Sequence, residues 1–136
     1  MQMPQDMKAF NAKLIAEFRA NGGKLSGPLA GMKPMLLTTQ GARTGEERTV
    51  VNGYRPFGDA YAVIASNNAA PAAPHWFFNL VKNPQATAEI ASEKFGVRAR
   101  VAEGEERERA ASVIDYLPSQ QAKTQRLIPV VILERI

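Results

Sequence analysis

The sequence predicts a mainly β protein in which six antiparallel strands close into a barrel, with helices at its periphery. Six short segments are apolar or alternate apolar with polar residues, and most are joined by links too short for a parallel crossover. The chain has no βαβ alternation, no GxGxxG and no Walker loop, which argues against Rossmann and P-loop nucleotide folds. Because six short strands must hide their edges, a barrel is favoured over an open sheet.

The first half of the chain is expected to contain one helix and three strands. Within residues 1–23, apolar side chains recur at helical spacing from position 4 to position 21, and Gly22-Gly23 ends this amphipathic pattern. Short runs rich in β-branched residues follow, separated by glycine and proline. We expect a loop at 24–33, strands at 35–39, 48–54 and 61–66, a turn at 41–45 and a tight connection at 56–59.

The second half is expected to contain two helices and three strands. A polar loop at 67–74 precedes a short helix at 75–81, which Asn83-Pro84 ends. Alternating apolar and polar residues then predict two strands, at 87–91 and 95–101, joined by a turn at 92–94. An acidic start predicts a longer helix at 103–117, and an apolar run predicts a last strand at 128–133. No repeat or linker interrupts the chain, so residues 1–136 are expected to form a single domain.

Composition excludes several kinds of chemistry. The chain has no cysteine, which excludes disulfides and thiolate sites, and its one histidine, His75, is too few for a histidine-rich metal site. We therefore expect no metal, and a bound cofactor is a better candidate for the chemistry than side chains. No apolar run approaches the roughly 20 residues that span a bilayer, and charged residues interrupt the start of the chain. The expected location is cytoplasmic.

The excess positive charge is unevenly placed. The formal net charge is +4 over 136 residues. Residues 1–55 hold eight basic and four acidic side chains, whereas residues 56–136 hold nine of each. This distribution favours an anionic partner near the first segment, although a solvated basic surface would give the same count. No run of lysine and arginine is interleaved with aromatic residues, so nucleic acid is not an expected partner.

Three local patterns could form a binding site. In residues 38–48 a strand runs into a turn with two glycines, a hydroxyl and two arginines, which suits a phosphate or carboxylate but also fits an ordinary hairpin. Residues 65–68 end a strand with small polar groups that could bind the edge of a heterocycle, or could form a simple polar loop. Residues 75–80 contain the only tryptophan, Trp76, which could pack beside a planar ligand or anchor the core.

These patterns belong to a longer ordered series of motifs. The series consists of Leu36–Gly45 with Arg48, Val63–Asn68, Pro74–Leu80 with Asn83-Pro84, Gly104–Arg107 and Thr124–Val131. Its order and spacing resemble the deazaflavin (F420)-dependent nitroreductase family, a family of split-β-barrel oxidoreductases. The resemblance covers nearly the whole chain from Asn21 onward, and the ordered set is specific although no single motif is.

The resemblance implies a six-stranded split β-barrel that binds reduced coenzyme F420, an 8-hydroxy-5-deazaflavin with a phospholactyl-glutamate tail. The anionic tail would lie on the arginine-containing turn, where the positive charge is concentrated. Hydride leaves C5 of the deazaflavin, so the protein mainly orients cofactor and acceptor. The implied cofactor contacts are Ala42, Arg43, Thr44, Arg48, Val50, Val51, Asn52, Gly53, Ile64, Ala65, Ser66, Asn67, His75, Trp76, Phe77, Phe78 and Asn79.

The chain departs from the family pattern at several positions. Ala42 stands where a second basic residue is usual, and Asn67 stands where a lysine is usual. Asn68-Ala69 replaces a Gly-Gly pair, and Phe77 replaces a tyrosine. The best-known nitroreductase of the family has several tyrosines where this chain has only Tyr116 followed by residues 117–121. These departures argue against nitroimidazole reduction more than against cofactor binding.

The expected activity is hydride transfer from F420H2 to an activated double bond or other electrophile of a hydrophobic small molecule. Enones, lactones, quinones and nitro compounds are the acceptor classes considered. The alternatives are an FMN-dependent split-barrel oxidoreductase and a non-catalytic protein that binds F420 or a fatty acid. Candidate proton donors are Ser66, Tyr54, His75 and Tyr116, none of them expected to be indispensable. We also expect a monomer or weak dimer, and the N-terminal helix could contact a membrane surface.

Overall fold

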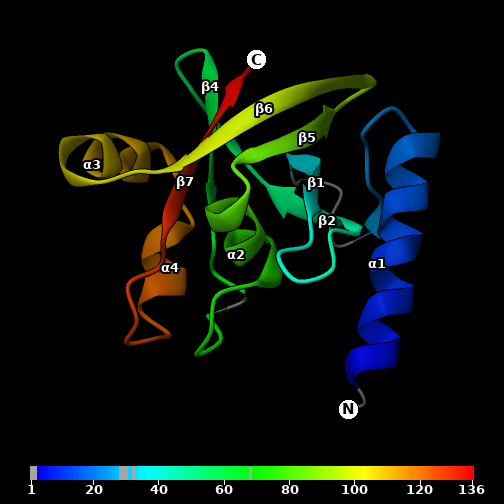
Figure 1. Ribbon diagram of the computed structural model, residues 1–136, viewed down its shortest axis with the longest axis horizontal. Helices are drawn as coiled ribbons and strands as arrows, with labels where there is room; N and C mark the ends of the chain where they lie inside the picture. The colour runs from blue at the N-terminus through cyan, green and yellow to red at the C-terminus, as the bar shows by residue number, and fades with distance from the viewer. Residues whose placement is uncertain (1–2, 28–30, 32, 68) are drawn as a thin grey trace.

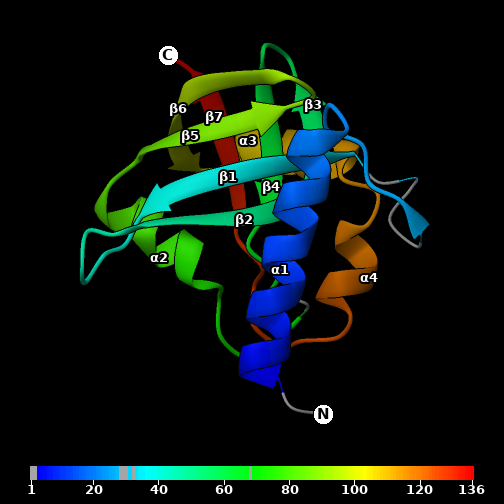
Figure 2. The ribbon, with the colours of Figure 1, turned by 90° about the vertical axis from the view of Figure 1, so that its right-hand side faces the viewer.

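The computed structural model describes residues 3–27, 31, 33–67 and 69–136, and it is built on one curled antiparallel sheet (Figures 1 and 2). Seven strands follow the order β2-β1-β5-β6-β7-β4-β3. The strands are β1 (Pro34–Gln40), β2 (Glu47–Gly53), β3 (Arg55–Phe57), β4 (Ala60–Ile64), β5 (Gln85–Ile90), β6 (Glu93–Val101) and β7 (Val130–Arg135). The helices are α1 (Met3–Ala20), α2 (His75–Lys82), α3 (Gly104–Val113) and α4 (Leu117–Gln121). The expected fold class, mainly β with peripheral helices, is confirmed.

Parts of four expected features lie outside the described residues. These are residues 1–2 of the N-terminal segment 1–23, residues 28–30 and 32 of the loop at 24–33, and Asn68, which belongs to both the motif at 65–68 and the loop at 67–74.

The seventh strand arises because the predicted strand at 48–54 continues and changes its partner. β2 pairs with β1, and just beyond it the N–H of Tyr54 donates to the carbonyl of Lys33 at 3.2 Å. The chain then leaves β1, and β3 pairs with β4 across a hairpin loop at Gly58-Asp59. The predicted connection at 56–59 is therefore wrong, because Pro56 belongs to an edge strand, where its missing N–H is tolerated. The two edge strands of the sheet, β2 and β3, are thus parts of one continuous segment that bends at Tyr54.

The hairpin between β5 and β6 turns earlier than expected. Ile90 pairs with Glu93, so the loop is Ala91-Ser92 rather than residues 92–94. Ala91 has a φ of 55°, as two-residue hairpin loops often require. Gly23, just after α1, packs against this loop, because a Cβ at Gly23 would lie 2.5 Å from the Cα of Ala91. A glycine predicted only to end a helix therefore also lets α1 approach the sheet.

The predicted helix at 103–117 is in fact two helices, α3 and α4. Ile114 follows α3 and is fully buried, and Pro118 lies in the first turn of α4. In one continuous helix, Pro118 would have no N–H to donate and its ring would clash with the carbonyl of Ile114. The proline therefore separates the two helices.

The helices cover different faces of the sheet. Leu36 and Leu37 are neighbours in β1 and point to opposite faces. Leu37 packs in a buried cluster with Trp76 and Leu80 of α2, whereas Leu36 packs with Phe18 of α1. The strands β1 and β2 therefore lie between α1 and α2 (Figure 2). On the other side of the molecule, α3 and α4 pack on a third cluster with β4 and β7.

The N-terminal half of α1 extends beyond the sheet (Figures 1 and 2). Phe18 is 1% exposed, whereas Phe10 is 52% exposed. Near its end, α1 is tied to β5 by Arg19, which donates to the carboxylate of Glu89 at 2.9 and 3.1 Å. No helix in the described part of the chain has both the length and the apolar composition needed to cross a membrane. Around Asn11 and Ile15, at its middle, α1 forms a wall beside β2.

Candidate functional site

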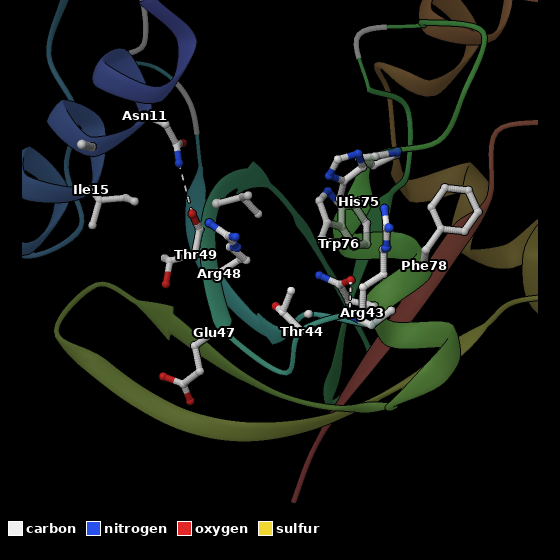
Figure 3. Close-up of a pocket in the computed structure, with 16 residues that line it drawn as sticks. Asn11, Ile15, Arg43, Thr44, Glu47, Arg48, Thr49, His75, Trp76 and Phe78 are labelled. Atoms are coloured by element: carbon white, nitrogen blue, oxygen red, sulfur yellow. Dashed lines mark hydrogen bonds between the residues drawn. The ribbon is translucent and has the colours of Figure 1, made fainter. Parts of the chain in front are cut away.

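A cleft of about 960 Å³ lies along the β2 edge of the sheet. In Figure 3, Asn11 and Ile15 of α1 lie on one side of it, His75 and Trp76 of α2 lie on the other, and Arg48 lies between them. Several implied cofactor contacts, which come from three separate stretches of sequence, meet there. These are Ala42, Arg43, Thr44, Arg48, Val50, His75, Trp76, Phe78 and Asn79.

The glycine turn, residues 41–46, closes on itself through backbone hydrogen bonds. The N–H of Gly41 donates to the carbonyl of Glu46 at 2.7 Å, and the N–H of Gly45 donates to the carbonyl of Gly41 at 2.9 Å. A Cβ on Gly41 would lie 3.1 Å from the Glu46 oxygen and 3.2 Å from the Thr44 hydroxyl. This crowding explains why the first position of the turn is a glycine.

Asn79 anchors the glycine turn to α2. This side chain is 7% exposed, its Oδ1 accepts the N–H of Ala42 at 3.0 Å, and its Nδ2 donates to Thr39 Oγ1 at 3.0 Å. Lys82 adds a second link, from its Nζ to the carbonyl of Ala42 at 2.8 Å. Asn79, implied by resemblance to contact the cofactor, therefore has a structural task at the floor of the cleft.

The glycine turn presents donors and positive charge to the cleft. Among the described residues, the backbone N–H groups of Arg43 and Thr44 find no acceptor within the protein. Arg48 makes one ion pair, with the exposed Glu46 at 3.2 Å, and such exposed pairs are weak. Two arginines, two N–H groups and the Thr44 hydroxyl can thus bind an anion.

The wall opposite α1 is aromatic. Trp76 is 6% exposed and joins the inner cluster of the sheet, while Phe78 is 51% exposed. His75 is exposed at the first position of α2, directly after Pro74. This wall offers flat apolar surface and one imidazole to a ligand.

The remaining implied contacts lie elsewhere. Val51 faces α1, Phe77 packs with the inner cluster, and Ile64 packs towards α3 and α4. The strand end at 65–67 enters a loop beside α4. The implied contacts outside this cleft are Val51, Asn52, Gly53, Ile64, Ala65, Ser66, Asn67 and Phe77.

Of the four candidate proton donors, only His75 lines the cleft. Ser66 is engaged within the protein, since its hydroxyl donates to Gln120 Oε1 at 2.5 Å and accepts the N–H of Ala69 at 3.0 Å. Burial raises the pKa of the Tyr54 phenol, with a smaller contribution from Tyr61. Burial likewise raises the pKa of Tyr116, and the nearby Arg55 only partly offsets this. Both tyrosines therefore stay protonated at neutral pH and are weak acids.

Sequence reasoning missed the contribution of α1. Asn11, Ala12 and Ile15 line the cleft, and Asn11 Nδ2 donates to the carbonyl of Thr49 in β2 at 3.1 Å. The apolar periodicity of this helix predicted a buried face but not the strand that it would cover. Asn11 belongs to the polar side of that pattern, so only the tertiary contact identifies it.

Comparison with known proteins gives a consistent result. A sequence profile of F420H2-dependent quinone reductases matches residues 12–135. The chain is 32% identical over 128 residues to an F420H2-dependent quinone reductase of Mycobacterium tuberculosis (strain ATCC 25618 / H37Rv), covering 88% of this chain and 86% of that protein. The solved structure of an F420-H2 dependent reductase, FDR-A, matches with a TM-score of 0.66 and 36% identity over 75% of this chain and 94% of its own.

Another solved structure, described as a domain-swapped dimer, matches with a TM-score of 0.68 and 31% identity, covering 96% of this chain and 99% of its own. The expected kinship with F420-dependent oxidoreductases is confirmed, and neither the FMN-dependent nor the non-catalytic alternative is needed. By sequence over nearly its whole length and by fold, the chain belongs to the F420H2-dependent quinone reductase family.

Proposed function

We propose that this chain reduces a quinone to the hydroquinone, with F420H2 held in the cleft as the hydride donor. Family membership makes the chain an F420H2-dependent oxidoreductase, and the quinone is the acceptor named for the family and for the mycobacterial relative. When bound, the cofactor supplies a hydride from C5 of its deazaflavin ring. The observation that carries the proposal is a cleft whose lining combines a glycine turn, two arginines and an aromatic wall.

The glycine turn fits the anionic part of the cofactor. Arg43 and Arg48 supply two guanidinium groups, and the free N–H groups of Arg43 and Thr44 supply uncharged donors. Ala42, at a position where a second basic residue is usual, leaves the turn with fewer charges, but its N–H is already held by Asn79. In our proposal these groups bind the phosphate and carboxylates of the tail.

The neighbouring surfaces fit a planar ring. A volume of about 960 Å³ lies at the upper end of the range for small-molecule sites, roughly 300–1,000 Å³. On the α2 side, Trp76 and His75 would contact the ring.

Reduction of a quinone needs one hydride and one proton per turnover. The hydride adds to the quinone, and a proton from solvent completes the hydroquinone. In our proposal, His75 passes this proton from water at the open side of the cleft. Because water also reaches the cleft directly, replacing His75 should slow turnover by less than the 10²–10⁴-fold typical of a dedicated general acid.

The proposal is tested by following oxidation of F420H2 by absorbance, with a naphthoquinone or benzoquinone as the acceptor. Wild-type protein should oxidise one F420H2 per hydroquinone formed, and NADPH alone should support no turnover. Replacing Arg43 and Arg48 together by alanine removes two charged donors, each contributing about 1.5–3 kcal/mol. The Kd for F420 should therefore rise by at least about a hundredfold.

A matched control is Arg98→Ala, which removes an exposed arginine of β6 outside the cleft. This variant should bind F420 as the wild type does. If the double variant also binds F420 with unchanged affinity, the glycine turn is not the tail site. If F420H2 is oxidised only with a nitro compound or an enone, the quinone assignment is wrong.

A further inference from the structure

Residues 65–72 form most of the connection from the end of β4 to the start of α2, and the residues described in this loop, 65–67 and 69–72, have almost no sheet hydrogen bonds of their own. The last such bond runs from the N–H of Ala65 to the carbonyl of Pro129 at 2.9 Å. Beyond it, Asn67 and Ala69 have φ values of 51° and 60°, a region that is disfavoured for residues with a Cβ. This loop therefore needs partners from elsewhere in the chain to keep its conformation.

Arg126 supplies those partners. Its Nε donates to the carbonyl of Ala70 at 2.8 Å, and one terminal nitrogen donates to the carbonyls of Ser66 at 2.6 Å and Ala65 at 3.2 Å. A guanidinium presents several donors in one rigid plane, so it can hold both ends of the loop together. A lysine could approach one of these carbonyls but has no such plane.

Arg126 is itself held in place by α4. Gln121 Nε2 donates to the carbonyl of Arg126 at 2.7 Å, and Gln121 Oε1 accepts the N–H of Ile128 at 2.9 Å. The preceding residue, Gln120, accepts the hydroxyl of Ser66 at 2.5 Å. Helix α4, the segment around Arg126 and the loop at 65–72 therefore form one hydrogen-bonded unit.

This unit ends next to the cleft. Asn67 Nδ2 donates to the carbonyl of Ala72 at 3.1 Å, and Pro74 follows two residues later as the N-cap of α2. His75 and Trp76, which line the cleft, form the first turn of that helix. The position of the aromatic wall therefore depends on the conformation of the loop.

We propose that Arg126 is a positioning residue for the reaction: it fixes the loop at 65–72 and thereby holds the first turn of α2 in the wall of the cleft. The inference explains the Thr124–Val131 motif, which contributes no residue to the lining of the cleft. It rests on the proposed function only for its kinetic consequence. The structural consequence can be measured without cofactor or substrate.

The first test uses the fluorescence of Trp76, the only tryptophan of the chain, in the cofactor-free protein. Arg126→Ala should shift the emission to longer wavelength and increase quenching by acrylamide, because the first turn of α2 becomes more accessible to water. The matched control is Arg107→Ala, which removes one arginine bond, 2.8 Å to the carbonyl of Ile128, without touching the loop. The control should keep the wild-type spectrum, and circular dichroism should show both variants folded.

The second test compares the effects of the substitution on KM and on kcat, because a positioning residue should affect KM more than the chemical step. In Arg126→Ala the KM for F420H2 should rise about tenfold, because the cofactor must order the first turn of α2 when it binds, while kcat falls by less than about threefold. An unchanged Trp76 signal would overturn the proposal, whatever the kinetics. If Arg126→Ala does not fold, Arg126→Lys takes its place and should show the same change in fluorescence. If the wild type reduces no quinone, the proposed function fails while the fluorescence test still decides the role of Arg126.

Discussion

The glycine turn and the loop at 65–72 both follow the end of a strand, but different kinds of partner hold them. The turn is closed by its own backbone, through the bonds of Gly41 and Gly45, with Asn79 as an anchor. The loop is held by side chains that lie 54 to 61 positions later in the sequence, those of Gln120 and Arg126. The side of the cleft formed by the glycine turn is thus held mostly by contacts local in sequence, whereas the aromatic side depends on contacts with the C-terminal part of the chain.

The largest expected effect comes from removing the anchor of the turn. Asn79→Ala leaves the N–H of Ala42 and the hydroxyl of Thr39 without their partners beside the core. Each such group costs about 1–3 kcal/mol, so the free energy of unfolding should fall by about 3 kcal/mol in urea denaturation. The Kd for F420 should also rise, because the turn loses its fixed position.

The control for this change is Asn83→Ala, which removes two exposed hydrogen bonds close to the same turn: its Nδ2 donates to Gln40 Oε1 at 2.7 Å, and its Oδ1 accepts the N–H of Gln85 at 3.2 Å. It should change the free energy of unfolding by less than about 0.5 kcal/mol, as exposed sites usually do. Equal effects of the two variants would show that Asn79 does not anchor the turn. The turn would then be held by its own backbone alone, in full contrast to the loop.

A smaller effect is expected from Ser66→Ala in the loop. Ser66 is 8% exposed, and removing its hydroxyl leaves Gln120 Oε1 without this donor, while the N–H of Ala69 keeps the carbonyl of Ser66 as an acceptor at 3.0 Å. Because Arg126 still holds the loop, the free energy of unfolding should fall by about 1–2 kcal/mol in urea denaturation. Turnover with a quinone should keep a kcat within about tenfold of the wild type, because this hydroxyl is engaged inside the protein. A complete loss of turnover with normal F420 binding would instead identify Ser66 as the acid.

The same contrast explains what the sequence could predict. Strand alternation, glycines and arginines are local signals, so the sheet, the turn and the charge around Arg43 and Arg48 were predictable. The bend at Tyr54 was not, because it depends on the chain leaving β1 at the end of β2 and pairing with β4 through β3. The break before Pro118 had a local signal, the proline itself, which the apolar pattern of the helix obscured. Arg126 lies in a motif that the sequence shows, but its role was not predictable because its hydrogen-bond partners lie in another part of the chain.

The third wall of the cleft, α1, is joined to β5 more weakly than the glycine turn or the loop at 65–72 is held. Arg19 and Glu89 join α1 to β5 through two hydrogen bonds, but the Arg19 side chain is 51% exposed and the Glu89 side chain is 12% exposed. The hydrogen bond from Arg19 holds the pKa of Glu89 below its ordinary value of 4.5, although partial burial opposes this. Because Arg19 is surrounded by water, the pair should contribute only about 0.5 kcal/mol.

The pH dependence of this small contribution has a definite sign. A carboxyl whose pKa is lower in the folded than in the unfolded chain stabilises the fold above its unfolded pKa, and this stability is lost as the pH falls through the folded pKa. Glu89→Gln should therefore be less stable than the wild type at neutral pH, and the two should converge once the pH lies below the lowered pKa of Glu89. Urea denaturation of both proteins at neutral and acidic pH measures this difference, and high salt should reduce it. A difference that grew on acidification would show that burial, and not Arg19, controls Glu89, and α1 would then be attached by its apolar contacts with β1 and β2 and by the hydrogen bond from Asn11 to Thr49.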